Sequence, residues 1–218
     1  MVAYPAQPSG ANAQKCWNWY RPEDQQRGKG EPALIAGLAR EIQRDHGADP
    51  RRTYVAGLSA GGAAAVLVAA AYPDVFAAAG VHSGLPAGGA YDVPSAFAAM
   101  RSGVRGKPHG AAVPTIVFHG SADRTVHPEN GAAVLSQALA AMPGLTVAAT
   151  DGLAAGGRAC RVTTHADADG TSQAEFWQIE GAGHAWAGGN PAGSYADAAG
   201  PDASRQMVRF FLQHRMRA

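Results

Sequence analysis

Short apolar segments that are typical of buried strands alternate with helix-forming segments along most of the chain. The clearest strand, residues 114–119 (PTIVFH), is β-branched and aromatic and shows no polar alternation. We expect further strands at residues 53–58 and 77–82. Strands that are apolar on both faces need helices on both sides of their sheet. The sequence therefore predicts an α/β fold with a mostly parallel sheet covered by helices on both faces.

Helix signals lie between these strands. Pro32 and Gly47 mark the start and end of a first helix. Its apolar residues recur at helical spacing, and they are Leu34, Ile35, Leu38 and Ile42. Residues 61–71 and 130–142 also predict helices. Residues 201–213 predict a last one, whose buried stripe is Met207, Phe210 and Phe211.

The remaining segments complete a single domain that spans residues 1–218. Residues 2–4 predict a very short strand before Pro5. Residues 86–110 are rich in Gly, Pro and Ala, and we expect them to form an excursion above the sheet. Residues 161–165 and 174–180 predict a strand pair around a turn at Asp169-Gly170.

The charge balance excludes some classes of partner. Lys and Arg number 18 and Asp and Glu 17, so the formal net charge is +1 and offers no attraction to nucleic acid or an anionic membrane. No run approaches the roughly 18 apolar residues of a membrane span. Residues 1–10 lack the charged and apolar regions of a signal peptide. We therefore expect neither a nucleic-acid nor a membrane partner.

Metal and cofactor motifs are also missing from the sequence. It has no H-E-x-x-H, residues 167–170 (DADG) lack the other ligands of a calcium loop, and no glycine-rich phosphate motif opens a helix. We expect no metal and no cofactor. The two cysteines, Cys16 and Cys160, leave open one structural disulfide or two free thiols.

The stretch AGLSAGG (residues 56–62) holds Ser59 in a G-x-S-x-G frame between a predicted strand and a predicted helix. This is the setting of a nucleophile elbow. We expect Gly57 and Gly61 to leave room where strand and helix pack, and the Ala60 N–H to face a developing oxyanion. A glycine-rich turn that merely contains a serine is the alternative.

A serine nucleophile needs a histidine base and an acid that orients it. In chain order, Asp123 follows strand 114–119 and His184 follows strand 174–180. The order Ser, acid, His is that of an α/β-hydrolase. These residues predict a triad of Ser59, Asp123 and His184.

Other polar residues are weaker candidates. Ser83 ends a strand but lacks the preceding glycine of an elbow. We expect five of the remaining histidines to be structural, namely His46, His82, His119, His127 and His214. Three other acids lie before the second strand pair or in its turn, namely Asp151, Asp167 and Asp169.

Four strings are more specific than this general pattern. They are residues 16–38 (CWNWYRPEDQQRGKGEPALIAGL), 51–65 (RRTYVAGLSAGGAAA), 117–131 (VFHGSADRTVHPENG) and 177–214, which begin WQIEGAGHAWAGG. Together they resemble the polyhydroxybutyrate depolymerase-like esterases, relatives of the feruloyl and acetyl xylan esterases. The resemblance covers nearly the whole chain. It implies an α/β-hydrolase fold, ester hydrolysis through an acyl-enzyme, and the same triad.

The chain departs from this family at its N-terminus. Family members usually carry earlier strands and a histidine-glycine loop that completes the oxyanion hole and bears a cysteine partner for the one at position 16. The resemblance thus implies an N-terminally truncated sheet, half an oxyanion hole, and an unpaired Cys16. We expect the open sheet edge to form a homodimer. The resemblance also implies an extracellular or periplasmic location.

The sequence therefore predicts a serine carboxylic-ester hydrolase that acts on polyesters or on feruloyl or acetyl esters. Trp186 and Trp17 are candidates for binding the substrate. A core role for Trp186 is equally expected. Trp17 and Trp19 either line the same cleft or pack the loop, and packing is favoured. The competing hypothesis is a hydrolase scaffold that binds an ester or glycan with little turnover. A peptidase or acyltransferase with the same triad is a third.

Overall fold

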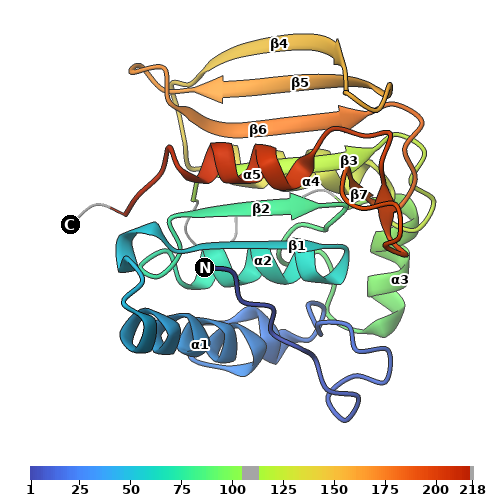
Figure 1. Ribbon diagram of the computed structural model, residues 1–218. Coiled ribbons are helices and arrows are strands. Elements are labelled where there is room, and N and C mark those ends of the chain that lie inside the picture. The colour runs from blue at the N-terminus through green and yellow to red at the C-terminus, as the bar shows by residue number, and fades with distance from the viewer. Residues whose placement is uncertain (105–112, 217–218) are drawn as a thin grey trace.

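The computed structural model describes residues 1–104 and 113–216. Within them, a six-stranded sheet has the order β1-β2-β3-β6-β5-β4 (Figure 1). The strands are β1 (Tyr54–Leu58), β2 (Ala78–His82), β3 (Thr115–Gly120), β4 (Thr146–Leu153), β5 (Ala159–Ala166) and β6 (Ser172–Ile179). The first three and β6 are parallel, while β5 and β4 add to β6 in antiparallel fashion. The predicted α/β fold with a mostly parallel sheet is confirmed.

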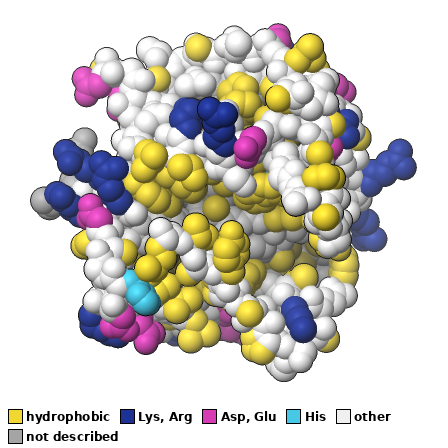
Figure 2. Space-filling view, in the orientation of Figure 1, with side chains coloured by type: hydrophobic (Ala, Val, Ile, Leu, Met, Phe, Trp, Pro, Cys, Tyr) yellow, Lys and Arg dark blue, Asp and Glu magenta, His cyan; other side chains and the backbone are white. Residues whose placement is uncertain are grey.

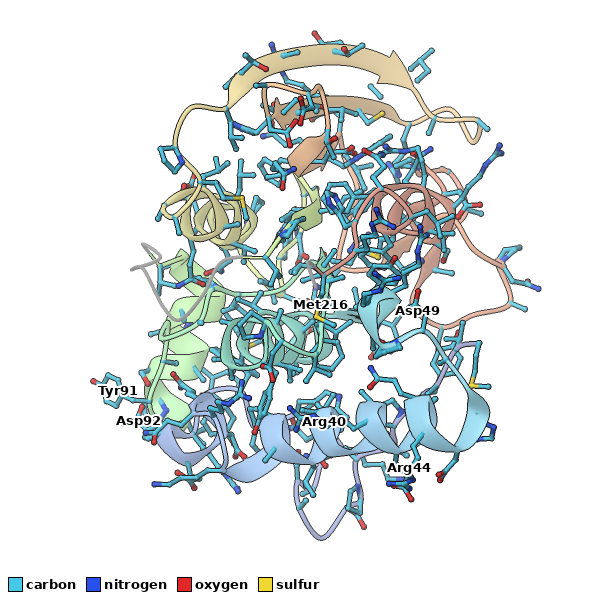
Figure 3. The ribbon with its side chains drawn as sticks, turned by 90° about the vertical axis from the view of Figure 1, so that its left-hand side faces the viewer. Arg40, Arg44, Asp49, Tyr91, Asp92 and Met216 are labelled. Atoms are coloured by element: carbon cyan, nitrogen blue, oxygen red, sulfur yellow. The ribbon has the colours of Figure 1, made fainter. Side chains whose placement is uncertain are left out.

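Helices cover both faces of the sheet. They are α1 (Gly30–His46), α2 (Ala60–Ala71), α3 (Val93–Ser102), α4 (Glu129–Leu139) and α5 (Ala203–Phe211), with 3-10 turns η1 (Pro22–Gln25) and η2 (Pro50–Arg52). Ile116 and Phe118 of β3 pack against α5, whereas Val117 between them packs against α4. Figure 3 shows α4 and α5 on opposite sides of the strands. The unbroken apolar pattern of β3 thus reflects burial on both faces.

The first helix follows its sequence signals. Gly47 adopts a left-handed conformation (φ 62°) directly after the last residue of α1, where other residues are strained. Leu34, however, is 70% exposed, and Ala36 is fully buried against α2. The apolar stripe of α1 is therefore rotated from the predicted one. The stripe predicted for α5, Met207, Phe210 and Phe211, is buried as expected.

The sheet has one more strand at one edge than the sequence predicts. The β5–β6 pair forms around Asp169-Gly170, with Gly170 at φ 80°, as expected. Beyond it lies β4, which is exposed along its whole length. Its small and polar residues give no buried-strand pattern, and its backbone pairing with β5 is what makes it a strand.

The opposite edge is formed by β1. The prediction of a short strand at residues 2–4 is wrong. These residues are exposed coil and pair with no strand among the described residues. Figure 2 shows hydrophobic side chains gathered in the middle of the face that carries α5, with Lys and Arg side chains both above them and at the margins. An open β1 edge is compatible with a homodimer, which stays a prediction.

The expected excursion at residues 86–110 is partly described. It contains α3, which begins with a capping box between Asp92 and Ser95. Tyr91 and Asp92 lie at one side of Figure 3. Residues 105–110 of this prediction lie outside the described residues. Two short strands, β7 (Trp186–Ala187) and β8 (Ala196–Asp197), form a separate pair near the carboxyl ends of the parallel strands (Figure 1).

Both cysteines are free thiols in the structure. Cys16 is exposed in the N-terminal loop, and Cys160 is buried in β5. Of the two alternatives that the sequence leaves open, the structure has the unpaired one. None of the helices in the described part of the chain is long and apolar enough to cross a membrane.

Candidate active site

Ser59 lies in a sharp turn between β1 and α2. Its backbone has φ 57° and ψ −121°, a combination that L-residues rarely adopt. The Ser59 N–H donates to the carbonyl of His82 at the end of β2 (2.9 Å), which fixes the turn to the neighbouring strand. The strand, the strained serine and the helix form the elbow that the sequence predicts.

Glycines let the strand and helix meet at this turn. A Cβ atom on Gly57 would lie 2.2 Å from the backbone of Gly61, so only glycine fits at position 57. A Cβ on Gly61 itself would meet nothing closer than Trp17 Cδ1 at 3.8 Å, and the expected collision there is wrong. Gly62 is the tight helix position instead, since its Cβ would lie 3.1 Å from three backbone atoms.

Adding one methyl group at Gly57 or at Gly61 should have opposite consequences for the stability of the fold. We expect Gly57→Ala to lower the free energy of unfolding by about 1–3 kcal/mol, because backbone must move to admit the Cβ. Gly61→Ala should leave stability unchanged or raise it by up to about 1 kcal/mol through helix propensity. Urea unfolding of the two variants measures the difference, and equal stabilities would contradict the assigned packing.

Asp123 is a buried carboxylate in the loop after β3. Its Oδ1 accepts the N–H groups of Thr125 and Val126 (both 2.9 Å), and its Oδ2 lies 2.7 Å from Nδ1 of His184. Burial alone would raise the pKa of Asp123. Hydrogen bonds from His119, His184 and Val126 outweigh burial and hold this pKa well below its usual range. The carboxylate is therefore charged and orients the imidazole.

His184 lies in the loop after β6, five residues beyond Ile179, the last residue of that strand. A Cβ on the preceding Gly183 would meet no atom within 4 Å, so the loop is open beside the ring. Since Nδ1 faces Asp123, Nε2 is the nitrogen left for a reacting group. The structure thus brings Asp123 and His184 together, as predicted.

Ser59 shares the same end of the sheet with these two residues. β1, β3 and β6 are parallel, and the loops that carry Ser59, Asp123 and His184 all leave their carboxyl ends. Among the described residues the Ser59 hydroxyl makes no hydrogen bond. Ala60 is the first residue of α2, and N–H groups in a first turn have no acceptor within their helix.

The three tryptophans that the sequence analysis singles out have different surroundings in the structure. Trp17 is half-buried and lies over the first turn of α2. Its Cδ1 would lie 3.8 Å from a Cβ atom on Gly61, which is two residues after Ser59. Trp186 is half-buried, donates from Nε1 to Ser204 Oγ (3.1 Å) and stacks on His82. Trp19 is buried against α2 and serves in packing.

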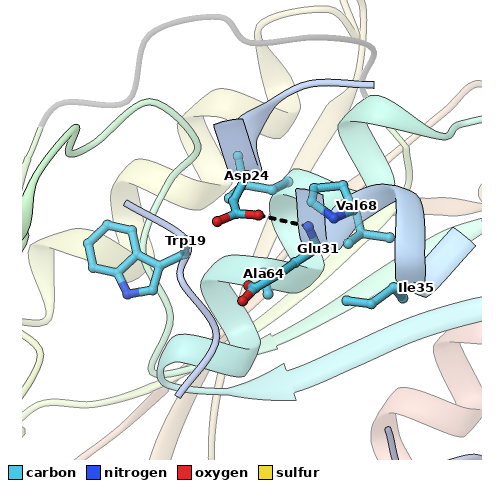
Figure 4. Close-up of a pocket in the computed structure, with 8 residues that line it drawn as sticks. Trp19, Asp24, Glu31, Ile35, Ala64 and Val68 are labelled. Atoms are coloured by element: carbon cyan, nitrogen blue, oxygen red, sulfur yellow. Dashed lines mark hydrogen bonds between the residues drawn. The ribbon is translucent and has the colours of Figure 1, made fainter. Parts of the chain in front are cut away.

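A small pocket beside Trp19 has a structural role. It is lined by Trp19, Asp24, Glu31, Pro32, Ile35, Ala64, Leu67 and Val68 (Figure 4). Asp24 Oδ1 accepts the Glu31 N–H (2.7 Å), and the Glu31 carboxylate accepts the backbone and side-chain N–H groups of Asn18 (both 2.7 Å). These bonds fasten the N-terminal loop to the start of α1.

Two histidines expected to be structural are part of the site's surroundings. His119 Nε2 lies 2.9 Å from the Val126 carbonyl and 3.5 Å from Asp123 Oδ2. His82 is buried at the end of β2, and its Nε2 accepts the Ala187 N–H (3.0 Å). Only their positions at strand ends could have indicated these contacts. Ser83, the alternative nucleophile, is fully buried.

The buried His82 should make stability depend on pH. Burial lowers its pKa from an ordinary 6.5 to about 3, and the nearby His119 and His184 add to this effect against the opposing charge of Asp123. The unfolded chain therefore binds a proton between about pH 6.5 and pH 3 that the folded chain excludes, so stability falls as the pH falls through this range. Each unit of pKa difference corresponds to about 1.4 kcal/mol.

We expect His82→Gln, which cannot take up this proton, to lose less stability than the wild type on acidification. Urea unfolding at pH 7 and pH 4 measures both losses, and the difference between them should be a few kcal/mol. Equal losses in the two proteins would contradict the assigned burial.

Comparison with known proteins identifies the family. The family model described as Esterase PHB depolymerase matches residues 1–164. The chain belongs to this family. The matched region contains Ser59 and Asp123, whereas His184 lies beyond it.

Several curated esterases are similar to this chain. Poly(3-hydroxyalkanoate) depolymerase C of Paucimonas lemoignei is 40% identical over 143 residues, which are 59% of this chain and 34% of that protein. Acetylxylan esterase A of Aspergillus ficuum is 27% identical over 60% of this chain and 48% of its own length. Feruloyl esterase B of Thermothelomyces thermophilus is 35% identical over 44% and 32%. The chain thus spans between about a third and a half of these relatives.

Solved structures show the same fold. An acetyl xylan esterase from Aspergillus awamori superposes with a TM-score of 0.67 at 20% identity, over 91% of this chain and 73% of that one. A PHB depolymerase crystallised as its S39A variant with an R3HB trimer gives a TM-score of 0.50 at 19% identity, over 75% and 52%. The chain of this Esterase PHB depolymerase family member therefore has the α/β-hydrolase fold.

Proposed function

We propose that this protein is a serine carboxylic-ester hydrolase whose triad is Ser59, His184 and Asp123. The observation that carries the proposal is the 2.7 Å bond between Asp123 and His184 Nδ1 at the sheet end where the strained Ser59 turn also lies. An acid that orients a histidine beside an elbow serine is the arrangement that serine hydrolases use. Membership in an esterase family supports ester substrates.

In the proposed reaction the Ser59 hydroxyl attacks the ester carbonyl while His184 Nε2 takes its proton. The oxyanion that forms is stabilised by the Ala60 N–H and by the N-terminal end of α2. His184 then gives the proton to the leaving alcohol, and an acyl-enzyme remains on Ser59. Water, activated by the same histidine, attacks the acyl-enzyme and releases the acid. Asp123 stabilises the imidazolium in both steps.

The proposed substrates are polyesters of the hydroxyalkanoate type, or feruloyl or acetyl esters. The names of the relatives, a poly(3-hydroxyalkanoate) depolymerase, an acetylxylan esterase and a feruloyl esterase, support this range. Trp17, which lies over the first turn of α2, is the proposed wall for the acyl group. Trp186 is a weaker candidate because its ring is already packed on His82 and bonded to Ser204.

Two further proposals concern the setting of the enzyme. We propose that it acts outside the cytoplasm, as the family resemblance implies, and that it forms a homodimer through the open β1 edge. Light scattering tests the second, and a monomer with full esterase activity would overturn it.

A series of nitrophenyl esters of increasing acyl length tests the proposed activity and the substrate range together. We expect hydrolysis of the series with a preferred acyl length, and rapid labelling of the protein by a fluorophosphonate probe at Ser59 alone, found by peptide mapping. A folded protein that neither hydrolyses these esters nor takes up the probe is a binding scaffold instead. Preferential cleavage of amide substrates would indicate a peptidase.

A further inference from the structure

We propose that His82 is a positioning residue that fixes the separation between Ser59 and His184. This inference rests on the proposed function of these two residues. His82 is the last residue of β2, the strand between the one that carries Ser59 and the one that carries Asp123.

One residue holds both sides of the site. The backbone carbonyl of His82 accepts the N–H of Ser59 (2.9 Å), which ties the elbow to β2. Its side chain accepts the N–H of Ala187 at Nε2 (3.0 Å), and Ala187 lies three residues after His184. Ser59 and the His184 loop are thus bonded to the two ends of a single residue.

The imidazole is held firmly enough to act as a spacer. It stacks on Phe118, with ring centres 5.7 Å apart and 9° between planes, and on Trp186, with ring centres 5.2 Å apart and 27° between planes. Nδ1 lies 3.2 Å from Ser83 Oγ. Because Nε2 accepts a hydrogen bond, the neutral ring carries its proton on Nδ1 and donates it to that oxygen. Both nitrogens are therefore used, and the ring has one orientation.

The ring stays neutral under the conditions in which an esterase works. An imidazolium has two donors and no acceptor, so protonation would break the Ala187 bond. The pKa of His82 is lowered to about 3 by burial and by the neighbouring His119 and His184. The acceptor for Ala187 is thus available well below neutral pH.

His82 does not itself reach a substrate. It is 1% exposed, and its polar atoms all bond to the protein. Its influence on the reaction must therefore pass through Ser59 and His184. A displacement of about 1 Å in a catalytic group costs roughly 10²-fold in rate, so a lost spacer should be visible in turnover before it is visible in substrate binding.

Two variants separate the hydrogen bond from the volume of the ring. His82→Gln keeps an acceptor oxygen near the position of Nε2, whereas His82→Phe keeps the flat ring and removes the acceptor. We expect His82→Phe to lower kcat for nitrophenyl acetate and the labelling rate of Ser59 by a fluorophosphonate about 10²-fold, with KM nearly unchanged. His82→Gln should recover most of the loss.

His214→Phe is the matched control. His214 is also a buried histidine, but it follows α5 and contacts the start of β1 through the Tyr54 hydroxyl, at the opposite end of the sheet. This variant should lose stability without losing turnover. Reduced turnover in His214→Phe equal to that in His82→Phe would mean that only general stability is measured, and would overturn the inference.

The remaining outcomes are also decisive. If the wild type labels at Ser59 and folded His82→Phe labels equally fast, the positioning role fails and the proposed function stands. If the wild type does not label, both fail. Should His82→Phe not fold, nitrogen-detected NMR of the wild type takes its place. The inference is supported if Nε2 of His82 is unprotonated between pH 8 and pH 5 and if His82→Gln turns over faster than His82→Leu. A protonated Nε2 overturns it.

Discussion

Replacing Ser59 with alanine should lower kcat for nitrophenyl esters by about 10⁶-fold, close to the loss expected when a triad nucleophile is removed. In the proposed reaction the Ser59 Oγ forms the acyl-enzyme, and this variant lacks that atom. Its fold should be intact, because Ser59 fixes its turn through the backbone bond to His82 and not through its hydroxyl. The change to alanine also leaves the packing around the turn unchanged. The free energy of unfolding measured in urea should therefore change by less than about 1 kcal/mol.

Ser136→Ala is the matched control for this variant. Ser136 is an exposed serine on α4 whose hydroxyl bonds to its own helix at Ala132. Its loss should leave the rate unchanged. Assays with freshly purified wild type, Ser59→Ala and Ser136→Ala, run side by side, measure the three rates of nitrophenyl ester hydrolysis. If the wild type and Ser59→Ala hydrolyse the esters equally, the proposed triad is wrong.

Replacing Asp123 with asparagine should lower kcat by about 10⁴-fold. The amide that would face His184 Nδ1 donates a hydrogen bond where the carboxylate accepted one at 2.7 Å. The imidazole would then place its proton on Nε2 and could not take one from Ser59. The labelling rate of Ser59 by a fluorophosphonate should fall in parallel, because that reaction needs the same base.

The rival acids provide the controls. Asp151 is exposed in β4 beside Arg161, and Asp167 caps the β5–β6 turn through the N–H groups of Asp169 and Thr171. Asp151→Asn and Asp167→Asn should keep wild-type kcat. A large loss in either of them, with little loss in Asp123→Asn, would show that the acid has been assigned to the wrong strand.

The core elements could be predicted from the sequence because their signals are local. β3 is apolar on both faces, and the structure buries all six of its residues. Gly47 ends α1 in a left-handed conformation that the sequence pattern requires. The loop positions of Asp123 and His184 followed from strand ends alone, and the structure joins them.

The parts that the sequence missed depend on partners far along the chain. β4 has no buried face and exists through its ladder with β5. Residues 2–4 have the composition of a strand but no neighbour in the sheet to pair with. Gly62 and not Gly61 is the tight position on α2, because the rotation of the helix decides which of the two adjacent glycines meets the strand.

The sequence by itself determined the alternation of the four parallel strands with helices α1, α2, α4 and α5, the serine turn after β1, and the loops that hold an acid and a base. These are properties of short segments, where glycine, proline and apolar spacing act through local sterics and burial. Only the tertiary structure decided the contact geometry, in which Asp123 Oδ2 lies 2.7 Å from Nδ1 of His184, 61 residues away in the chain, and His82 binds Ala187, 105 residues away. Such bonds form because a parallel sheet brings the ends of distant strands to one edge, and no local pattern records which side chains then lie within reach.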